Sequence, residues 1–179
     1  HEILTFEAFE NAITMLNAVG GSTNGILHLL ALSSEAGIKL TYDDFERIRK
    51  KTPHIADMKP GGSYVMNSLD KIGGIPFVLK KLLERNLINP NVITVTGKTI
   101  KENIEQFLIP DSPEQQIVKS TDSPLHDVGT AVILNGTLAP DGAVIKTAGV
   151  EMTEFTGVAR VFDREEIAFD AVSKGEIDE

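Results

Sequence analysis

The chain has 179 residues, of which 41% are hydrophobic and 24% charged, and it contains no Cys. The formal net charge of −9 argues against nucleic acid as a partner, because phosphate binding requires clustered Lys and Arg side chains. Without Cys, neither a disulfide nor a thiolate-ligated metal can form within this chain.

No apolar stretch reaches the roughly 18 residues that a membrane span needs, and no signal peptide is visible. The composition suits a cytoplasmic protein, and the chain opens on His1, not Met, which indicates an internal or processed start.

The first half of the chain is expected to form short helices. Thr5 is a candidate N-cap for a helix from Phe6 to about Val19, and Asn24 to Ala36 forms a second helix that Gly37 ends. His28 lies on the second helix beside apolar neighbours, and we expect it to be buried and hydrogen-bonded.

Five further elements follow before residue 110. The Thr41-x-x-Asp44 capping box begins a helix to about Lys51, and Ser63 caps a helix from Tyr64 to about Lys71. The next helix has Pro76 in its first turn and ends at about Arg85. A short strand from Val92 to Val95 follows, and the Thr99-x-x-Glu102 capping box begins a helix from Ile100 to Phe107.

The composition changes at Ile109, and the proline-rich stretch from Pro110 to Pro124 is typical of a connector. Beyond it the hydrophobic period shifts from helical to alternating. A hairpin is predicted from Ala131 to Leu134 and Thr137 to Ala139 around an Asn135-Gly136 type I′ turn, with another turn at Pro140-Asp141-Gly142. Further strands are predicted at Ala143 to Thr147 and Gly157 to Phe162. The Asp163-x-x-Glu166 box caps a last helix that runs to about Ser173 and that Gly175 ends. The fold class is therefore α/β, with a helical part in residues 1–109, a connector in residues 110–124 and a β-rich part in residues 125–179.

The run Gly20-Gly21-Ser22-Thr23-Asn24 lies between the first two predicted helices. The glycines can end the first helix, and a side-chain oxygen of Ser22, Thr23 or Asn24 can cap the second. This leaves free backbone N–H groups and small polar side chains at a positive helix end, which suits a carboxylate or phosphate ligand. The alternative is a helix joint whose residues serve only for capping.

Three other features were considered as sites. Lys146 follows the apolar run Ala143 to Ile145, and it either lies on a solvated strand face or is a cation in a pocket that binds an acid substrate. Gly97-Lys98-Thr99 is not a P-loop, because Val92 stands where that motif needs glycine. His54 and His126 lie in predicted loops without the paired spacing of a metal site.

A series of short motifs runs in order over nearly the whole chain: Gly20 to Leu30, Glu35 to Gly37, Thr41 to Phe45, Lys51 to Pro53, Met58 to Gly62, Gly73 to Pro76, Thr94 to Thr99, Leu138 to Lys146 and Ala159 to Asp163. Together they closely resemble the dihydroxy-acid dehydratase and phosphogluconate dehydratase family. The runs Lys51-Thr52-Pro53-His54, Asp57 to Pro60 and Lys146 to Gly149 resemble its dihydroxy-acid branch.

The resemblance implies that the intact protein removes water from 2,3-dihydroxy carboxylic acids and yields 2-keto acids, in the synthesis of valine and isoleucine. It also implies an iron–sulfur cluster, held by three Cys and acting as a Lewis acid, with a nearby Mg²⁺. This segment ligates neither group and is expected to hold no catalytic residue. It would form the end of an α/β N-terminal domain and the start of a β-barrel-like C-terminal domain. Its candidates for substrate binding are Ser22, Thr23, Asn24 and Lys146.

Two alternatives to this function stay open. One is a sugar-acid or phosphogluconate dehydratase of the same family. The other, if the chain is complete, is a non-catalytic acidic binding or scaffold module. The expected partner is a small-molecule dihydroxy acid, without nucleic acid or membrane, and the full-length enzyme is expected to be a cytoplasmic homo-oligomer.

Overall fold

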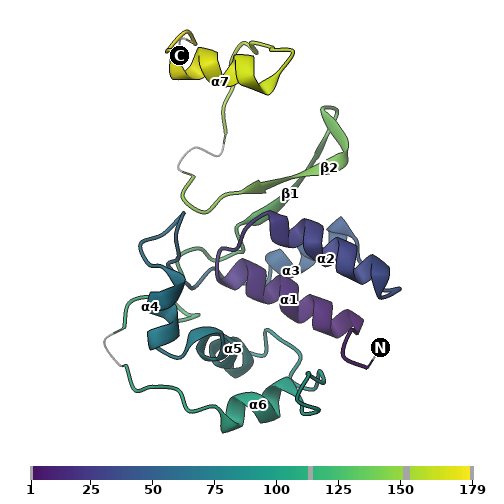
Figure 1. The fold of residues 1–179 in the computed structure, drawn as a ribbon, viewed down its shortest axis with the longest axis vertical. Coiled ribbons are helices and arrows are strands. Elements are labelled where there is room, and N and C mark those ends of the chain that lie inside the picture. The colour runs from purple at the N-terminus through teal and green to yellow at the C-terminus, as the bar shows by residue number, and fades with distance from the viewer. Residues whose placement is uncertain (1, 113–114, 151–153, 178–179) are drawn as a thin grey trace.

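A computed structural model describes residues 2–112, 115–150 and 154–177 (Figure 1). Its elements are, in order, α1 (Phe6–Ala18), α2 (Asn24–Glu35), α3 (Tyr42–Arg49), α4 (Met66–Lys71), α5 (Gly74–Glu84), α6 (Ile100–Gln106), β1 (Ala131–Gly136), β2 (Ala139–Lys146) and α7 (Glu165–Ser173). The predicted order of helices first and strands later is confirmed. None of the helices within these ranges is long and apolar enough to cross a bilayer.

Two buried clusters hold the elements together. One joins α1, α2, α3 and β1 through Ile13, Ile26, Phe45, Ile48, Ala131 and Ile133. The other joins the end of α1, residues 55–58, α4, α5 and residues 117–118. Figure 1 shows the hairpin lying over the α1–α3 side, while α7 stands apart from the helices of the first half. Both clusters contain residues from beyond position 110, so apolar burial packs the later part of the chain on the earlier part.

Two points of residues 117–126 pair with residues 54–57, through isolated antiparallel bridges between Ala56 and Val118 and between His54 and His126. The backbone N–H of Asp57 donates to the Ile117 carbonyl at 2.8 Å, and the N–H of His54 donates to the His126 carbonyl at 2.9 Å. Ile117 and Val118 are buried. Backbone pairing therefore holds the later half of residues 110–124 against the helical part, and the division into two domains at these residues stays a prediction.

Most predicted caps are confirmed. The Thr5 hydroxyl accepts from the Ala8 N–H at the start of α1, and Gly37 and Gly175 follow α2 and α7 with φ of 71° and 68°. Both glycines take the left-handed conformation that ends a helix at little steric cost.

Two predicted helix starts are wrong. α4 begins at Met66 and not at Tyr64, because the Tyr64 N–H donates to the Asp57 carbonyl and its own carbonyl accepts from Lys59. α7 begins after Arg164, so the predicted Asp163 cap lies one residue too early.

Two predicted strands are also absent. Residues 92–95 lead into a turn in which the Thr94 N–H donates to the Lys98 carbonyl, with an isolated bridge between Ile93 and Thr99. Residues 157–162 are described but contain no strand. Neither segment has a neighbouring strand to pair with in the described ranges, and a β-rich sequence alone leaves the backbone hydrogen bonds unpaired.

The predicted hairpin forms, but its turn lies elsewhere. Asn135 and Gly136 belong to β1, Gly136 pairs with Ala139, and the chain reverses at residues 137–138. The predicted turn at Pro140 to Gly142 lies within β2. Pairing Ala131 with Lys146 puts Ala131 and Ile133 into the α1–α3 cluster, and this burial sets the register over the local turn preference.

Candidate functional site

The glycine run closes the carboxyl end of α1. Gly20 has a φ of 60°; its N–H donates to the Asn17 carbonyl at 3.2 Å, and the Gly21 N–H donates to the Leu16 carbonyl at 2.8 Å. This pair of bonds is the Schellman arrangement that satisfies the last carbonyls of a helix. The prediction that these glycines end the first helix is confirmed.

The start of α2 differs from the prediction. Thr23 takes the N-cap position in a helical conformation with no side-chain cap bond, and the Ser22 hydroxyl instead accepts from the Asn24 N–H at 3.2 Å. The N–H groups of Gly25 and Ile26 donate to the carbonyls of Ser22 and Thr23. The backbone donors of Asn24, Gly25 and Ile26 are therefore occupied within the chain. The side chains of Ser22 and Asn24 are exposed and Thr23 is half-buried, so the turn presents three polar side chains to a ligand.

Lys146 is brought to this turn from the far end of the chain. Its Nζ donates to the Gly20 carbonyl at 2.6 Å across a separation of 126 residues. A cation at the carboxyl end of a helix is favoured by the helix dipole. The ammonium has three donors, of which one is used in this bond. The four predicted binding residues therefore lie on two segments that meet at Gly20, an arrangement that the spacing in the sequence does not indicate.

The docking of the hairpin on the helices sets the position of Lys146. Asn17 is 1% exposed, and its Oδ1 accepts from the Ala131 N–H at 3.3 Å. The guanidinium of Arg49 donates to the Gly129 carbonyl at 3.1 Å. These bonds attach the start of β1 to α1 and α3, and Lys146 pairs with Ala131 across the hairpin.

His54 is a neighbour of the turn that the sequence reasoning missed. It is 5% exposed, its Nε2 lies 2.9 Å from the Ala56 carbonyl oxygen, and its ring stacks on His126 with 5.3 Å between centroids. A Cβ placed on Gly20 would lie 2.5 Å from Nε2, so the Gly20 backbone sits against the ring. The signal available in the sequence was a His beside the apolar pair Ile55-Ala56.

Burial lowers the pKa of His54, and the charges of His126 and Lys146 lower it further, against the opposing effects of the Ala56 carbonyl and Asp57. The neutral imidazole is therefore favoured at neutral pH. Its Nδ1 is buried and has no hydrogen-bond partner in the described part of the chain.

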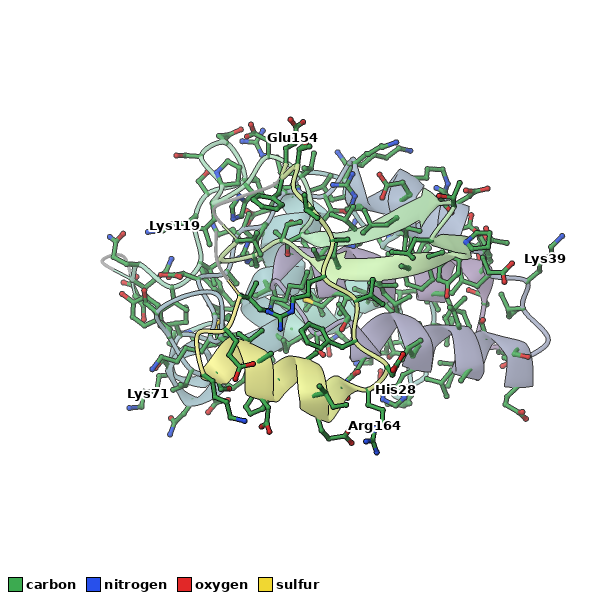
Figure 2. All side chains as sticks on the ribbon, turned by 90° about the horizontal axis from the view of Figure 1, so that it is seen from above. His28, Lys39, Lys71, Lys119, Glu154 and Arg164 are labelled. Carbon is green, nitrogen blue, oxygen red and sulfur yellow. The ribbon has the colours of Figure 1, made fainter. Side chains whose placement is uncertain are left out.

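His28 does not have the buried position predicted for it. Its side chain is exposed on α2 and is labelled at the lower side of the view in Figure 2. The reason is that α2 buries only Ile26 and Ser33, and His28 lies on the face of α2 that also exposes Leu27 and Leu32.

The residues of this segment do not fit an iron–sulfur cluster, because such clusters rest on thiolates and the sequence has no Cys. Among the described residues, no three His, Asp or Glu side chains gather where they could hold a metal. A cavity of about 460 Å³ between α5 and α6, lined by residues such as Lys80, Leu83 and Phe107, does not include the Gly20 turn.

Comparison with known proteins identifies the family. Residues 1–103 match the N-terminal domain, and residues 116–179 the C-terminal domain, of the dihydroxy-acid/6-phosphogluconate dehydratases. The chain is 57% identical over 178 residues to a dihydroxy-acid dehydratase of Saccharolobus solfataricus, covering 99% of this chain and 32% of that protein. It is 55% identical over 176 residues to a dihydroxy-acid dehydratase of Sulfolobus acidocaldarius, covering 98% of this chain and 31% of the relative.

The chain thus spans about a third of the length of the curated relatives that it matches. The two domain matches lie in the same order as the helical and strand-containing parts of the fold. The chain belongs to the dihydroxy-acid/6-phosphogluconate dehydratase family.

Proposed function

We propose that the intact protein is a dihydroxy-acid dehydratase, a hydro-lyase that converts 2,3-dihydroxy carboxylic acids to 2-keto acids. The observation that carries the proposal is the 57% identity to a dihydroxy-acid dehydratase over 99% of this chain. The sequence runs at residues 51–54, 57–60 and 146–149, which resemble the dihydroxy-acid branch of the family, support the same assignment.

The reaction removes the proton on C2 and the hydroxyl on C3 as one molecule of water. The enol that remains takes a proton at C3 and becomes the 2-keto acid, so no oxidant or reductant is consumed. The substrate keeps its carboxylate throughout, and donors that hold this group orient C2 and C3 without taking part in bond breaking.

We assign carboxylate binding to Ser22, Thr23, Asn24 and Lys146. Support comes from the bond between Lys146 and Gly20, which places an ammonium beside the turn that carries the three polar side chains. A cation with unused donors and nearby hydroxyl groups is a suitable arrangement for an anionic group.

The remaining features of the enzyme are proposed from the family resemblance. They are an iron–sulfur cluster and Mg²⁺ ligated outside this segment, a place in valine and isoleucine synthesis, a cytoplasmic location and a homo-oligomeric state. The proposed substrate is a small dihydroxy acid.

The test compares two substrates on the intact, cluster-loaded protein. We expect 2-keto acid to form from a branched 2,3-dihydroxy acid, with kcat/KM at least about 100-fold above that for 6-phosphogluconate, because a site shaped for one acid leaves polar groups of the other unpaired. The reverse preference would establish the sugar-acid alternative. Turnover of neither substrate would favour a binding module.

A further inference from the structure

His54 links the Gly20 turn to His126 and to its own segment, residues 54–56. Its backbone pairs with His126, its ring stacks on that residue, its Nε2 contacts the Ala56 carbonyl, and the Gly20 backbone lies against the ring edge. Gly20 in turn accepts the hydrogen bond from Lys146. The His54 imidazole therefore contacts the backbone of the same residue, Gly20, whose carbonyl accepts the hydrogen bond from the Lys146 ammonium.

The surroundings of the two ring nitrogens of His54 favour one protonation state. The Ala56 carbonyl can only accept, so Nε2 carries a hydrogen. A second proton would have to sit on Nδ1, which is buried and has no partner among the residues that the structure describes. An N–H in that position would be a buried donor without an acceptor, and the structure therefore favours the neutral Nε2–H tautomer.

We infer that His54 is a positioning residue, which as the neutral Nε2–H tautomer holds the Gly20 turn, and with it Lys146, in the geometry that binds the substrate carboxylate. This inference rests on the proposed function for its link to substrate. The tautomer and the order of the turn can be measured without any reaction.

Three charged or titratable groups act on the ring. His126 stacks on it, Lys146 approaches from β2, and Asp57 lies on its own segment. A protonated His54 would add a positive charge beside His126 and Lys146, with Asp57 as the opposing charge. Acidification is therefore expected to loosen the turn and weaken carboxylate binding, while the site stays intact above the ordinary pKa of His.

The experiment compares His54→Gln and His126→Gln with the wild-type in the intact enzyme. Gln at position 54 can still offer an N–H donor to Ala56 but does not titrate. In the wild-type we expect kcat/KM to fall by about tenfold per pH unit below the pKa of His54, mainly through KM. The His54→Gln enzyme should not show this fall of kcat/KM at low pH. The His126→Gln enzyme should still show the fall (the acid limb of the profile), but at higher pH, because loss of the repulsive His126 charge raises the pKa of His54.

Two measurements independent of activity accompany the kinetics. NMR of protein with ¹⁵N-labelled His should show a hydrogen on Nε2 and none on Nδ1 of His54 at pH 7. The hydrogen-exchange protection of Gly20 and Gly21 should fall on acidification in the wild-type and not in His54→Gln.

An Nδ1–H tautomer, or an acid limb that His54→Gln retains unchanged, would overturn the inference. If His54→Gln does not fold, an unshifted limb in His126→Gln would overturn it as well. If the intact protein dehydrates no dihydroxy acid, the proposed function fails, whereas the NMR and exchange data still decide whether His54 orders the turn.

Discussion

Ser22 and Thr23 illustrate how adjacent residues of one type take different roles. The Ser22 hydroxyl accepts from the Asn24 N–H at the start of α2, whereas Thr23 occupies the N-cap position without a side-chain cap bond. A bond at the start of the helix therefore explains the hydroxyl of Ser22 but not the hydroxyl of Thr23. Substitutions at the two positions can thus distinguish a structural role from a ligand-binding role at the same turn.

Replacing Thr23 with Val tests that separation, because the shape is kept and only the hydroxyl is lost. We expect the free energy of unfolding to change by less than about 0.5 kcal/mol. If the hydroxyl binds the carboxylate, kcat/KM should fall by about 10- to 150-fold, equivalent to one hydrogen bond to a charged group of about 1.5–3 kcal/mol.

Ser22→Ala is the matched control in the stability measurement. Loss of its bond to the Asn24 N–H should lower the free energy of unfolding by about 0.5–1 kcal/mol. A Thr23→Val enzyme with unaltered kinetics would remove Thr23 from the binding site.

Among the elements, α1 and α2 end in the same way but in different surroundings. Gly20 and Gly37 both follow a helix with positive φ, of 60° and 71°. A Cβ on Gly20 would meet the His54 ring, whereas a Cβ on Gly37 would meet nothing within 4 Å. Both positions need glycine for the backbone conformation, and Gly20 needs it also for a close approach.

Alanine substitutions at these two positions separate the two requirements. Gly37→Ala should lower the free energy of unfolding by about 1–2 kcal/mol, the cost of a left-handed residue with a Cβ. Gly20→Ala should cost about 1–3 kcal/mol more, because the buried His54 ring must move. Thermal or urea unfolding of both variants gives the difference. Equal losses would show that the contact between Gly20 and His54 contributes no stability.

At the scale of the whole molecule, the parts before and after residue 110 share both buried clusters. The hydrogen bonds of Asn17 and Arg49 hold the start of β1, and the pairing of residues 117–119 with residues 55–57 holds the segment before it. The stretch near Leu108, which is 92% exposed, makes no such backbone pairing with the described residues.

Limited proteolysis of the chain compares the stretch just before the predicted connector of residues 110–124 with the later half of that connector. Proteinase K, which cleaves after most apolar residues, should cut around Leu108 well before it cuts within residues 117–119, because cleavage requires a locally unfolded and exposed backbone. Mass spectrometry of early fragments identifies the sites. A cut after Phe155, which is 80% exposed, is also expected and does not bear on the connector. Equal resistance at residues 107–108 and 117–119 would contradict the prediction.

Anaerobic reconstitution with iron and sulfide tests the cofactor expectation for this segment. Because the sequence has no Cys, we expect the 179-residue chain to gain no cluster absorption and no dehydratase activity. The intact protein under the same conditions is the positive control. A stoichiometric cluster spectrum from the segment would refute the expectation.

The sequence alone was sufficient for the local features. Thr5 and the Thr99-x-x-Glu102 box begin their helices as predicted, and Gly37 and Gly175 end theirs. These features depend on side chains within a few residues of the backbone groups that they satisfy, so the pattern itself contains the interaction. The family motifs are likewise a property of the chain order, and the family matches confirm them.

Tertiary structure decided what depends on distant residues. The hairpin register follows from the burial of Ala131 and Ile133, which overrode the local turn signal of Asn135-Gly136. Lys146 of the candidate site and the neighbouring His54 reach Gly20 only because the hairpin and residues 52–58 pack around the end of α1. Hydrophobic burial is non-directional and sums over the whole core, so no short stretch of sequence determines which distant polar groups it brings together.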